Sequence, residues 1–128
     1  MRVLFACVHN AGRSQMAAAF FNHLADPARA TATSAGTEPG SEVHPEVVAV
    51  MREAGIDLSQ VLPRYLTDEL ARSADLLITM GCGDACPMVR ARVREDWPIP
   101  DPRDMPPEKF REVRDLIGRK VKELLARL

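Results

Sequence analysis

Five residues near the start of the chain could together perform chemistry, and all of them lie in the stretch CVHNAGRS. Cys7 could act as a nucleophile, and the planar guanidinium of Arg13 could hold two oxygens of a tetrahedral oxyanion. Asn10 and Gly12 are residue types that tolerate left-handed backbone angles in a tight loop. The hydroxyl of Ser14 could form a hydrogen bond with the sulfur. One loop would then supply both a nucleophile and an anion site.

The segments on either side of this loop predict how it is held. The apolar run over residues 2 to 6 predicts a buried strand, and residues 13 to 25 predict a helix with one apolar face made of Met16, Ala17, Phe20, Phe21 and Leu24. Free N–H groups in a turn and at a helix start bind anions and favour a thiolate. We therefore expect a substrate site formed by Val8, His9, Asn10, Ala11, Gly12, Arg13 and Ser14. A small buried cysteine and a solvated arginine are the alternative, but the strand, turn and helix context favours catalysis.

The rest of the chain alternates between strand and helix patterns. Strands are predicted over residues 30 to 36, 74 to 80 and part of 94 to 100, and a helix over 45 to 55. A last helix starts at the two prolines 106 and 107, with an apolar stripe of Phe110, Val113, Ile117, Val121, Leu124 and Leu128. This alternation predicts an α/β fold with three layers: a four-stranded parallel, flavodoxin-like sheet of order 2-1-3-4 with helices on both faces. We expect a single domain over residues 1–128.

The predicted topology brings distant residues to one edge of the sheet. Ligands of open parallel sheets lie beyond the carboxyl ends of the strands, where the strand order reverses. Cys7 follows the first strand, Cys82 follows the third and Asp101 follows the fourth. We therefore expect these three side chains along the same rim.

Composition limits the classes of function. The chain has 17 basic and 18 acidic residues, so its net charge of -1 gives no overall field that would attract nucleic acid or an acidic membrane. No segment approaches the roughly 20 apolar residues of a membrane span. The apolar run at the start of the sequence is too short to be the core of a secretory signal peptide. We expect a cytoplasmic monomer that binds neither nucleic acid nor membrane. Three cysteines in a reducing compartment favour thiol chemistry over structural disulfides.

At four places the sequence resembles the low-molecular-weight protein tyrosine phosphatases and the arsenate reductases that share their fold. These are CVHNAGRSQ from Cys7, SAGT at residues 34 to 37, ITMGCGDACP at 78 to 87 and PDP at 100 to 102. The resemblance implies that Cys7 is the nucleophile, that Arg13 binds the oxyanion and that Asp101 is the general acid. A carboxyl group over the loop could protonate the leaving hydroxide or alkoxide.

The two further cysteines favour the reductase over the phosphatase. Resemblance to thioredoxin-coupled arsenate reductases implies that Cys82 attacks the arsenic adduct of Cys7, which releases arsenite and leaves a Cys7–Cys82 disulfide. Cys86 would then attack Cys82 and pass the disulfide to thioredoxin. The expected substrate is arsenate, with phosphate or sulfate as mimics, and thioredoxin is an external reductant with no bound cofactor. No aromatic residue follows the Asp-Pro pair before Phe110, which also suits a small inorganic anion better than phosphotyrosine.

Other functions remain open at this point. The chain could be a low-molecular-weight phosphatase whose extra cysteines are incidental or protect Cys7 from oxidation. It could also be a carrier or sensor that holds a phosphoryl group or a redox state on Cys7. Cys82 and Cys86 could bind zinc, but a lone C-x3-C pair is poor evidence for a tetrahedral site. Ala18 stands where potassium-binding relatives have Glu, so we expect no metal.

Overall fold

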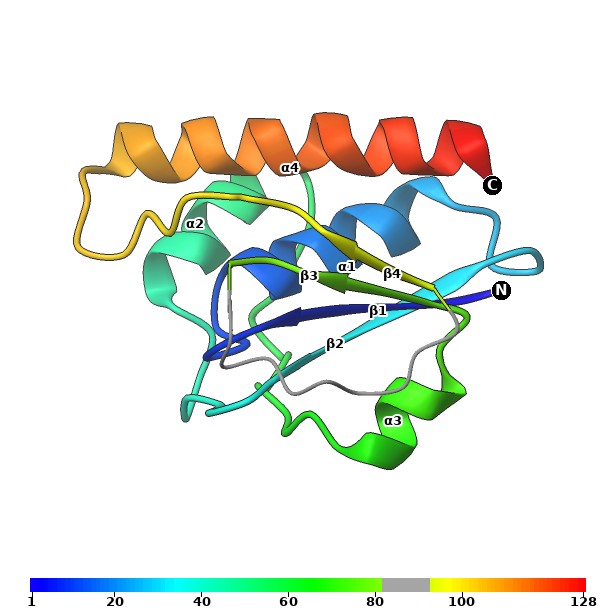
Figure 1. The fold of residues 1–128 in the computed structure, drawn as a ribbon. Coiled ribbons are helices and arrows are strands. Elements are labelled where there is room, and N and C mark those ends of the chain that lie inside the picture. Colours follow the sequence, from blue (N-terminus) through cyan, green and yellow to red (C-terminus); the bar gives the residue numbers. More distant parts are fainter. Residues whose placement is uncertain (82–92) are drawn as a thin grey trace.

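The structure is a computed structural model, and it describes residues 1–81 and 93–128. Cys82 and Cys86, with the relay predicted for them, lie outside the described residues. In chain order the elements are β1 (Arg2–Cys7), α1 (Arg13–Leu24), β2 (Thr31–Gly36), α2 (Pro45–Glu53), α3 (Asp68–Ser73), β3 (Leu76–Thr79), β4 (Arg94–Asp96) and α4 (Pro107–Arg127) (Figure 1).

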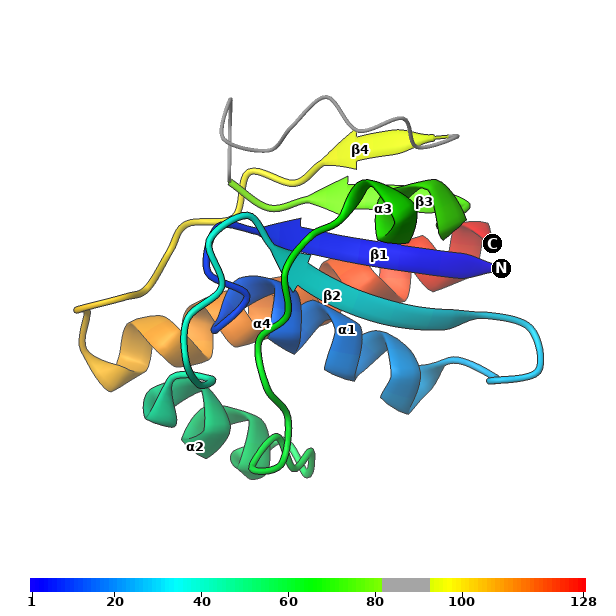
Figure 2. The ribbon, with the colours of Figure 1, turned by 90° about the horizontal axis from the view of Figure 1, so that it is seen from below.

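The four strands form one parallel sheet in the order β2-β1-β3-β4, which confirms the predicted topology (Figure 2). β1 is central: Cys7 pairs with Gly36 of β2, and Ala6 pairs with Thr79 of β3. A central parallel strand is covered on both faces, which explains its unbroken apolar run. The strand order reverses between β1 and β3, and Cys7 is the last residue of β1.

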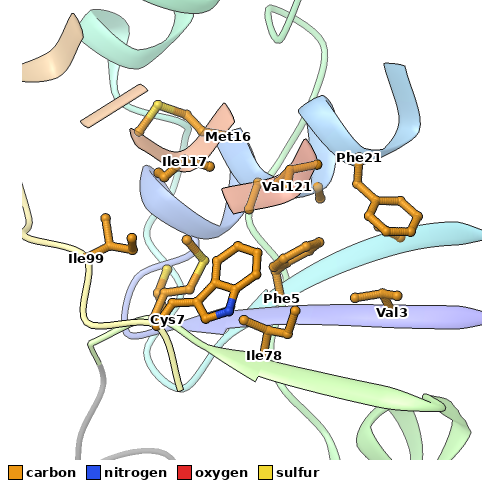
Figure 3. Packing of buried hydrophobic residues seen from close by; sticks show 14 of the residues in the cluster. Val3, Phe5, Cys7, Met16, Phe21, Ile78, Ile99, Ile117 and Val121 are labelled. Atoms are coloured by element: carbon orange, nitrogen blue, oxygen red, sulfur yellow. The ribbon is translucent and has the colours of Figure 1, made fainter. Parts of the chain in front are cut away.

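Alternation along β1 divides the core between the two faces of the sheet. Val3 and Phe5 belong to the larger cluster, which α1, α2 and α4 cover, whereas Leu4 and Ala6 pack with Ala71 of α3. Figure 1 shows α1, α2 and α4 on one side of the sheet and α3 on the other. This confirms the prediction of helices on both faces. Cys7 has the same parity as Phe5, so it lies on the face that α1 covers (Figure 3).

The apolar stripes of the two long helices are confirmed except at their ends. Phe110, Val113, Ile117, Val121 and Leu124 of α4 are all buried. However, Leu24 at the end of α1 and Leu128 after α4 are 43% and 50% exposed, so the apolar stripes are not buried at these ends. Both line a surface cavity of about 410 Å³ beside Met1.

Two further differences have local causes. The helix predicted over residues 45 to 55 ends at Glu53, because Gly55 adopts a φ of 82° and Ile56 N–H donates to the Met51 carbonyl at 2.9 Å. The short helix α3 was not predicted; Thr67 caps it by accepting from Leu70 N–H at 3.0 Å. Among the described residues, no helix is long and apolar enough to cross a lipid bilayer.

Candidate active site

The backbone of the loop after β1 is tied to the segment that follows β2. Four carbonyl oxygens of the loop, those of Cys7, Val8, His9 and Ala11, accept hydrogen bonds of 2.8 to 3.3 Å from backbone N–H groups of that segment. Within the described part of the chain, the N–H groups of residues 8 to 12 donate to no other group. With its carbonyls bonded outward, the loop keeps its donors for an anion, as an anion nest does.

Gly36 allows this close approach. A Cβ atom added to Gly36 would lie 2.6 Å from the Val8 carbonyl oxygen and 2.9 Å from Asn10 N. No other residue type fits between β2 and the loop without moving one of them. The motif SAGT therefore has a steric role in shaping the site.

Cys7 lies under the start of α1. Its side chain is buried, and its sulfur lies 2.8 Å from the Ser14 hydroxyl oxygen, as the sequence predicted. Ser14 is in the first turn of α1, which begins at Arg13, so the sulfur is close to the positive end of the helix dipole. A thiolate is favoured by both contacts.

Asn10 holds the loop from inside. Its side chain is fully buried, and Nδ2 donates to the Ser14 hydroxyl oxygen at 2.8 Å. Asn10 has a φ of 50°, a left-handed angle that its residue type tolerates, whereas Gly12 has a φ of -142° and does not use this freedom. Gly12 instead faces α2, where an added Cβ would lie 3.8 Å from Val47.

Arg13 is held at the rim by segments that follow β3 and β4. Its Nη1 donates to the Ile99 carbonyl oxygen at 3.0 Å, and its Nη2 lies 3.6 Å from Asp101 Oδ2. A Cβ atom on Gly81 would overlap Arg13 Nη1, so only glycine fits there. The predicted convergence of these regions is thus observed for Asp101 and for the residue that precedes Cys82.

Asp101 lies in a turn at the rim of the loop. Its carboxylate accepts from Arg103 N–H at 3.0 Å, as a turn-forming aspartate does, and it also lies beside Arg13. The side chain is 44% exposed, so the proton that it could supply is in contact with solvent.

The aromatic residues and His9 differ in how close they lie to the loop. Trp97 and Phe110 are buried in the core, as predicted for Phe110. Tyr65 is 62% exposed and its backbone forms a bridge with Gly36, the strand partner of Cys7. The His9 ring is bonded through Nδ1 to the Glu38 carbonyl oxygen at 3.1 Å. In the described ranges, no group of three or more His, Cys, Asp or Glu side chains could hold a metal ion.

Four contributors to the site were not found from the sequence. The Ile99 carbonyl is a backbone group, which no residue type reveals. Gly81 and Gly36 could be seen as glycines, but their steric roles depend on loops distant in the chain. Gln15 is part of the motif CVHNAGRSQ and binds Asn10 through its side-chain amide.

The fold and this loop define a class of protein. Residues 2–128 match the family model described as low molecular weight phosphotyrosine protein phosphatase. The chain belongs to this family. It is also similar to several arsenate reductases.

Three known proteins show this similarity. The glutaredoxin arsenate reductase of Synechocystis sp. is 36% identical over 130 residues, which are 99% of this chain and 98% of that protein. A solved arsenate reductase in the phosphate binding state is 36% identical with a TM-score of 0.88, covering 98% of this chain and 97% of the other. The thioredoxin-dependent arsenate reductase of Corynebacterium glutamicum is 41% identical with a TM-score of 0.81, covering 96% of this chain but 59% of that one. These relatives favour the reductase over the phosphatase.

Proposed function

We propose that this protein reduces arsenate to arsenite through Cys7, with Cys82, Cys86 and thioredoxin as the route for electrons. The observation that carries the proposal is that Gly81, the residue before Cys82, packs against the guanidinium of Arg13 at the rim of the loop. The last described residue before Cys82 therefore lies at the anion site. A phosphatase has no use for this arrangement, because water can hydrolyse a phosphocysteine.

The first step that we propose forms a sulfur–arsenic bond. The Cys7 thiolate attacks arsenate while the N–H groups of residues 8 to 14 and Arg13 hold the other oxygens. Hydroxide leaves as water when Asp101 supplies a proton. The exposed position of Asp101 suits this role, because its proton can be replaced from solvent.

The second stage moves two electrons to arsenic. Cys82, as a thiolate, attacks the Cys7 sulfur; the sulfur–arsenic bond breaks and its electron pair stays on arsenic, which leaves as arsenite. The products balance, because As(V) becomes As(III) while two thiols become one disulfide. Cys86 then attacks Cys82, Cys7 leaves as a thiolate, and the Cys82–Cys86 disulfide is reduced by a dithiol partner.

Thioredoxin is the partner that we propose, and a glutaredoxin is the alternative. The Corynebacterium glutamicum relative is a thioredoxin-dependent arsenate reductase, whereas the Synechocystis relative is named a glutaredoxin arsenate reductase. We also propose that the protein is cytoplasmic, since its thiols must be kept reduced between turnovers. We propose in addition that it is a monomer of one domain.

Slow hydrolysis of aryl phosphates is a second candidate activity. The family description and the contact between Arg13 and Asp101 favour it, because phosphate and arsenate are both tetrahedral oxyanions. We propose it as a side reaction of the same loop.

A coupled assay with single variants tests the proposal. Arsenate-dependent oxidation of NADPH is measured with thioredoxin and thioredoxin reductase, and then with glutaredoxin, glutathione and glutathione reductase, for the wild type and for Cys7→Ser, Cys82→Ser and Cys86→Ser. Cys7→Ser should lose every activity. The other two should lose arsenate reduction but keep slow hydrolysis of an aryl phosphate.

Two results would contradict the proposal. Full arsenate turnover by Cys82→Ser would exclude the relay. If the wild type reduces no arsenate with either donor, while Cys7 becomes stably phosphorylated, the protein is a carrier.

A further inference from the structure

The side chain of Gln15 lies at the start of a buried hydrogen-bond chain that ends on the sulfur of Cys7. Gln15 is 4% exposed, and its Nε2 lies 3.1 Å from the Asn10 carbonyl oxygen and 3.0 Å from Asn10 Oδ1. It also lies 3.5 Å from the Leu62 carbonyl oxygen. Backbone carbonyl oxygens only accept, so the group that faces them must be the NH₂ of Gln15. The direction of the first hydrogen bond is thereby fixed.

The directions of the Asn10–Ser14 and Ser14–Cys7 hydrogen bonds follow from this bond and from one backbone N–H group. Asn10 Oδ1 accepts from Gln15 and also from Arg64 N–H at 2.9 Å, and a backbone N–H only donates. Asn10 must therefore present Nδ2 to the Ser14 hydroxyl oxygen, which lies 2.8 Å away. Since Ser14 Oγ accepts this bond, its own hydrogen is free to point at the Cys7 sulfur, 2.8 Å away. A bond donated to sulfur favours the thiolate.

Gln15 also binds the backbone of Asn10, whose φ of 50° is unfavourable for most residue types. One amide thus holds both the left-handed turn of the loop and the orientation of the Asn10 side chain. We propose that Gln15 is a positioning residue that keeps the Asn10–Ser14 pair donating toward Cys7 and so maintains the reactive thiolate. This deepens the proposed function, because it depends on Cys7 being the reactive thiol.

The test measures the ionisation of Cys7 directly by alkylation. The reduced protein reacts with iodoacetamide over a range of pH, and trypsin then separates residues 3–13, which contain Cys7, from residues 73–90, which contain the other two cysteines. Gln15→Met keeps the length of the side chain and removes its donor. The reaction midpoint should rise by about 0.5 to 1 pH unit, a threefold to tenfold slower reaction below the midpoint, as loss of one hydrogen bond allows.

Other charged groups near the loop do not change in this variant. In the described part of the chain they are Arg13 on α1, His9 in the loop, Glu38 after β2, His44 before α2, Arg64 before α3 and Asp101 after β4. A shift in Gln15→Met is therefore assigned to the lost donor.

Asn22→Leu is the matched control. Asn22 lies on the same helix and its amide makes two hydrogen bonds with the backbone of Ala32, at 2.8 and 2.9 Å, without touching the loop. This variant should lower stability and leave the Cys7 midpoint unchanged. If Gln15→Met also leaves the midpoint within about 0.2 pH unit of the wild type, the inference is overturned. Gln15→Glu places an acceptor opposite the same carbonyl groups, so it should shift the midpoint at least as far. It replaces Gln15→Met in the test if that variant does not fold.

A double-mutant cycle tests the route. In a Ser14→Ala background the chain is cut beside the sulfur, so Gln15→Met should no longer move the midpoint. An equal shift in both backgrounds would exclude the route through Ser14. If Cys7 in the wild type reacts no faster at low pH than the other two cysteines, the proposed function itself is in error, which is a different outcome.

Discussion

The loop that holds Cys7 and the segment that carries Asp101 are fixed in different ways. The loop has its carbonyls bonded to the segment after β2 and its side chains joined in a buried hydrogen-bond chain. Asp101 has one turn hydrogen bond and an ion pair of 3.6 Å with Arg13, and its side chain is 44% exposed. The comparison indicates that the groups proposed to bind the anion are organised in advance, whereas the proposed proton donor stays accessible to solvent.

The largest effect that separates the two regions is expected for Asp101→Asn. Loss of the general acid should lower kcat for aryl phosphate hydrolysis by about 10² to 10³, since proton transfer contributes that much. Phosphate should bind as tightly as in the wild type, because the free N–H groups and Arg13 remain. The measurements are steady-state kinetics and calorimetric titration with phosphate.

Asp104→Asn is the control for this prediction. Asp104 is exposed, adopts a φ of 65° that Asn also tolerates, and belongs to the same segment. It should retain nearly full activity. If Asp101→Asn weakens phosphate binding as strongly as it slows turnover, Asp101 belongs to the organised region after all.

The opposite pattern is expected when the loop itself is moved. Gly36→Ala places a methyl group 2.6 Å from the Val8 carbonyl oxygen, so the loop must shift. A displacement near 1 Å should cost about 10²-fold in kcat/KM, and phosphate affinity should fall with it. Gly40→Ala is the matched change, since its Cβ would meet nothing closer than 3.8 Å. Equal activity of the two variants would show that the loop is not shaped by packing on β2.

A smaller effect is expected at β4, the strand that leads to Asp101. Hydrogen bonds from Arg127 and Trp97 and nearby positive charge hold the pKa of Glu95 below its ordinary value of 4.5, although burial opposes this. Because the folded pKa is lowered, the stabilisation is present above about pH 4.5 and is lost as pH falls through the folded value. Glu95→Gln should lower the free energy of unfolding by about 0.5 to 1 kcal/mol at pH 7.

Urea unfolding at pH 7 and at pH 3 measures this effect. The difference between Glu95→Gln and the wild type should shrink at the lower pH. Glu112→Gln, which removes an exposed pair with Lys109, should have almost no effect at pH 7. A difference that grows in acid would contradict the assigned direction.

The smallest effect is expected for Tyr65→Ala. Tyr65 is exposed and neighbours Gly36 rather than the loop, so a small anion should not contact it. The KM for arsenate should change by less than about twofold, within the range of surface substitutions. A tenfold rise for arsenate would place an aromatic side chain in the substrate site, which would favour the phosphatase activity.

The two regions also differ in how well the sequence predicted them. The strand, loop and helix around Cys7 are contiguous, so local patterns were sufficient for the Cys7–Ser14 contact and the left-handed Asn10. Sheet order followed from alternation and general topology rules. Residue type alone did not show which of Asn10 and Gly12 would use its left-handed freedom, and only Asn10 does.

Contacts between distant segments were not accessible in the same way. The fit of Gly81 against Arg13 and of Gly36 against Val8 depends on where β3 and β2 end relative to the loop. Gln15 was visible in the motif, but its role follows from the direction of hydrogen bonds to Asn10.

Single-turnover trapping tests the central claim most directly. Fully reduced protein is mixed with one equivalent of arsenate without thioredoxin, then alkylated and digested, and the arsenite released is quantified. The account predicts one equivalent of arsenite and a disulfide that involves Cys82, joined to Cys7 or to Cys86, with none formed in Cys7→Ser. Arsenite released while all three thiols remain free, or a disulfide formed equally without arsenate, would contradict it.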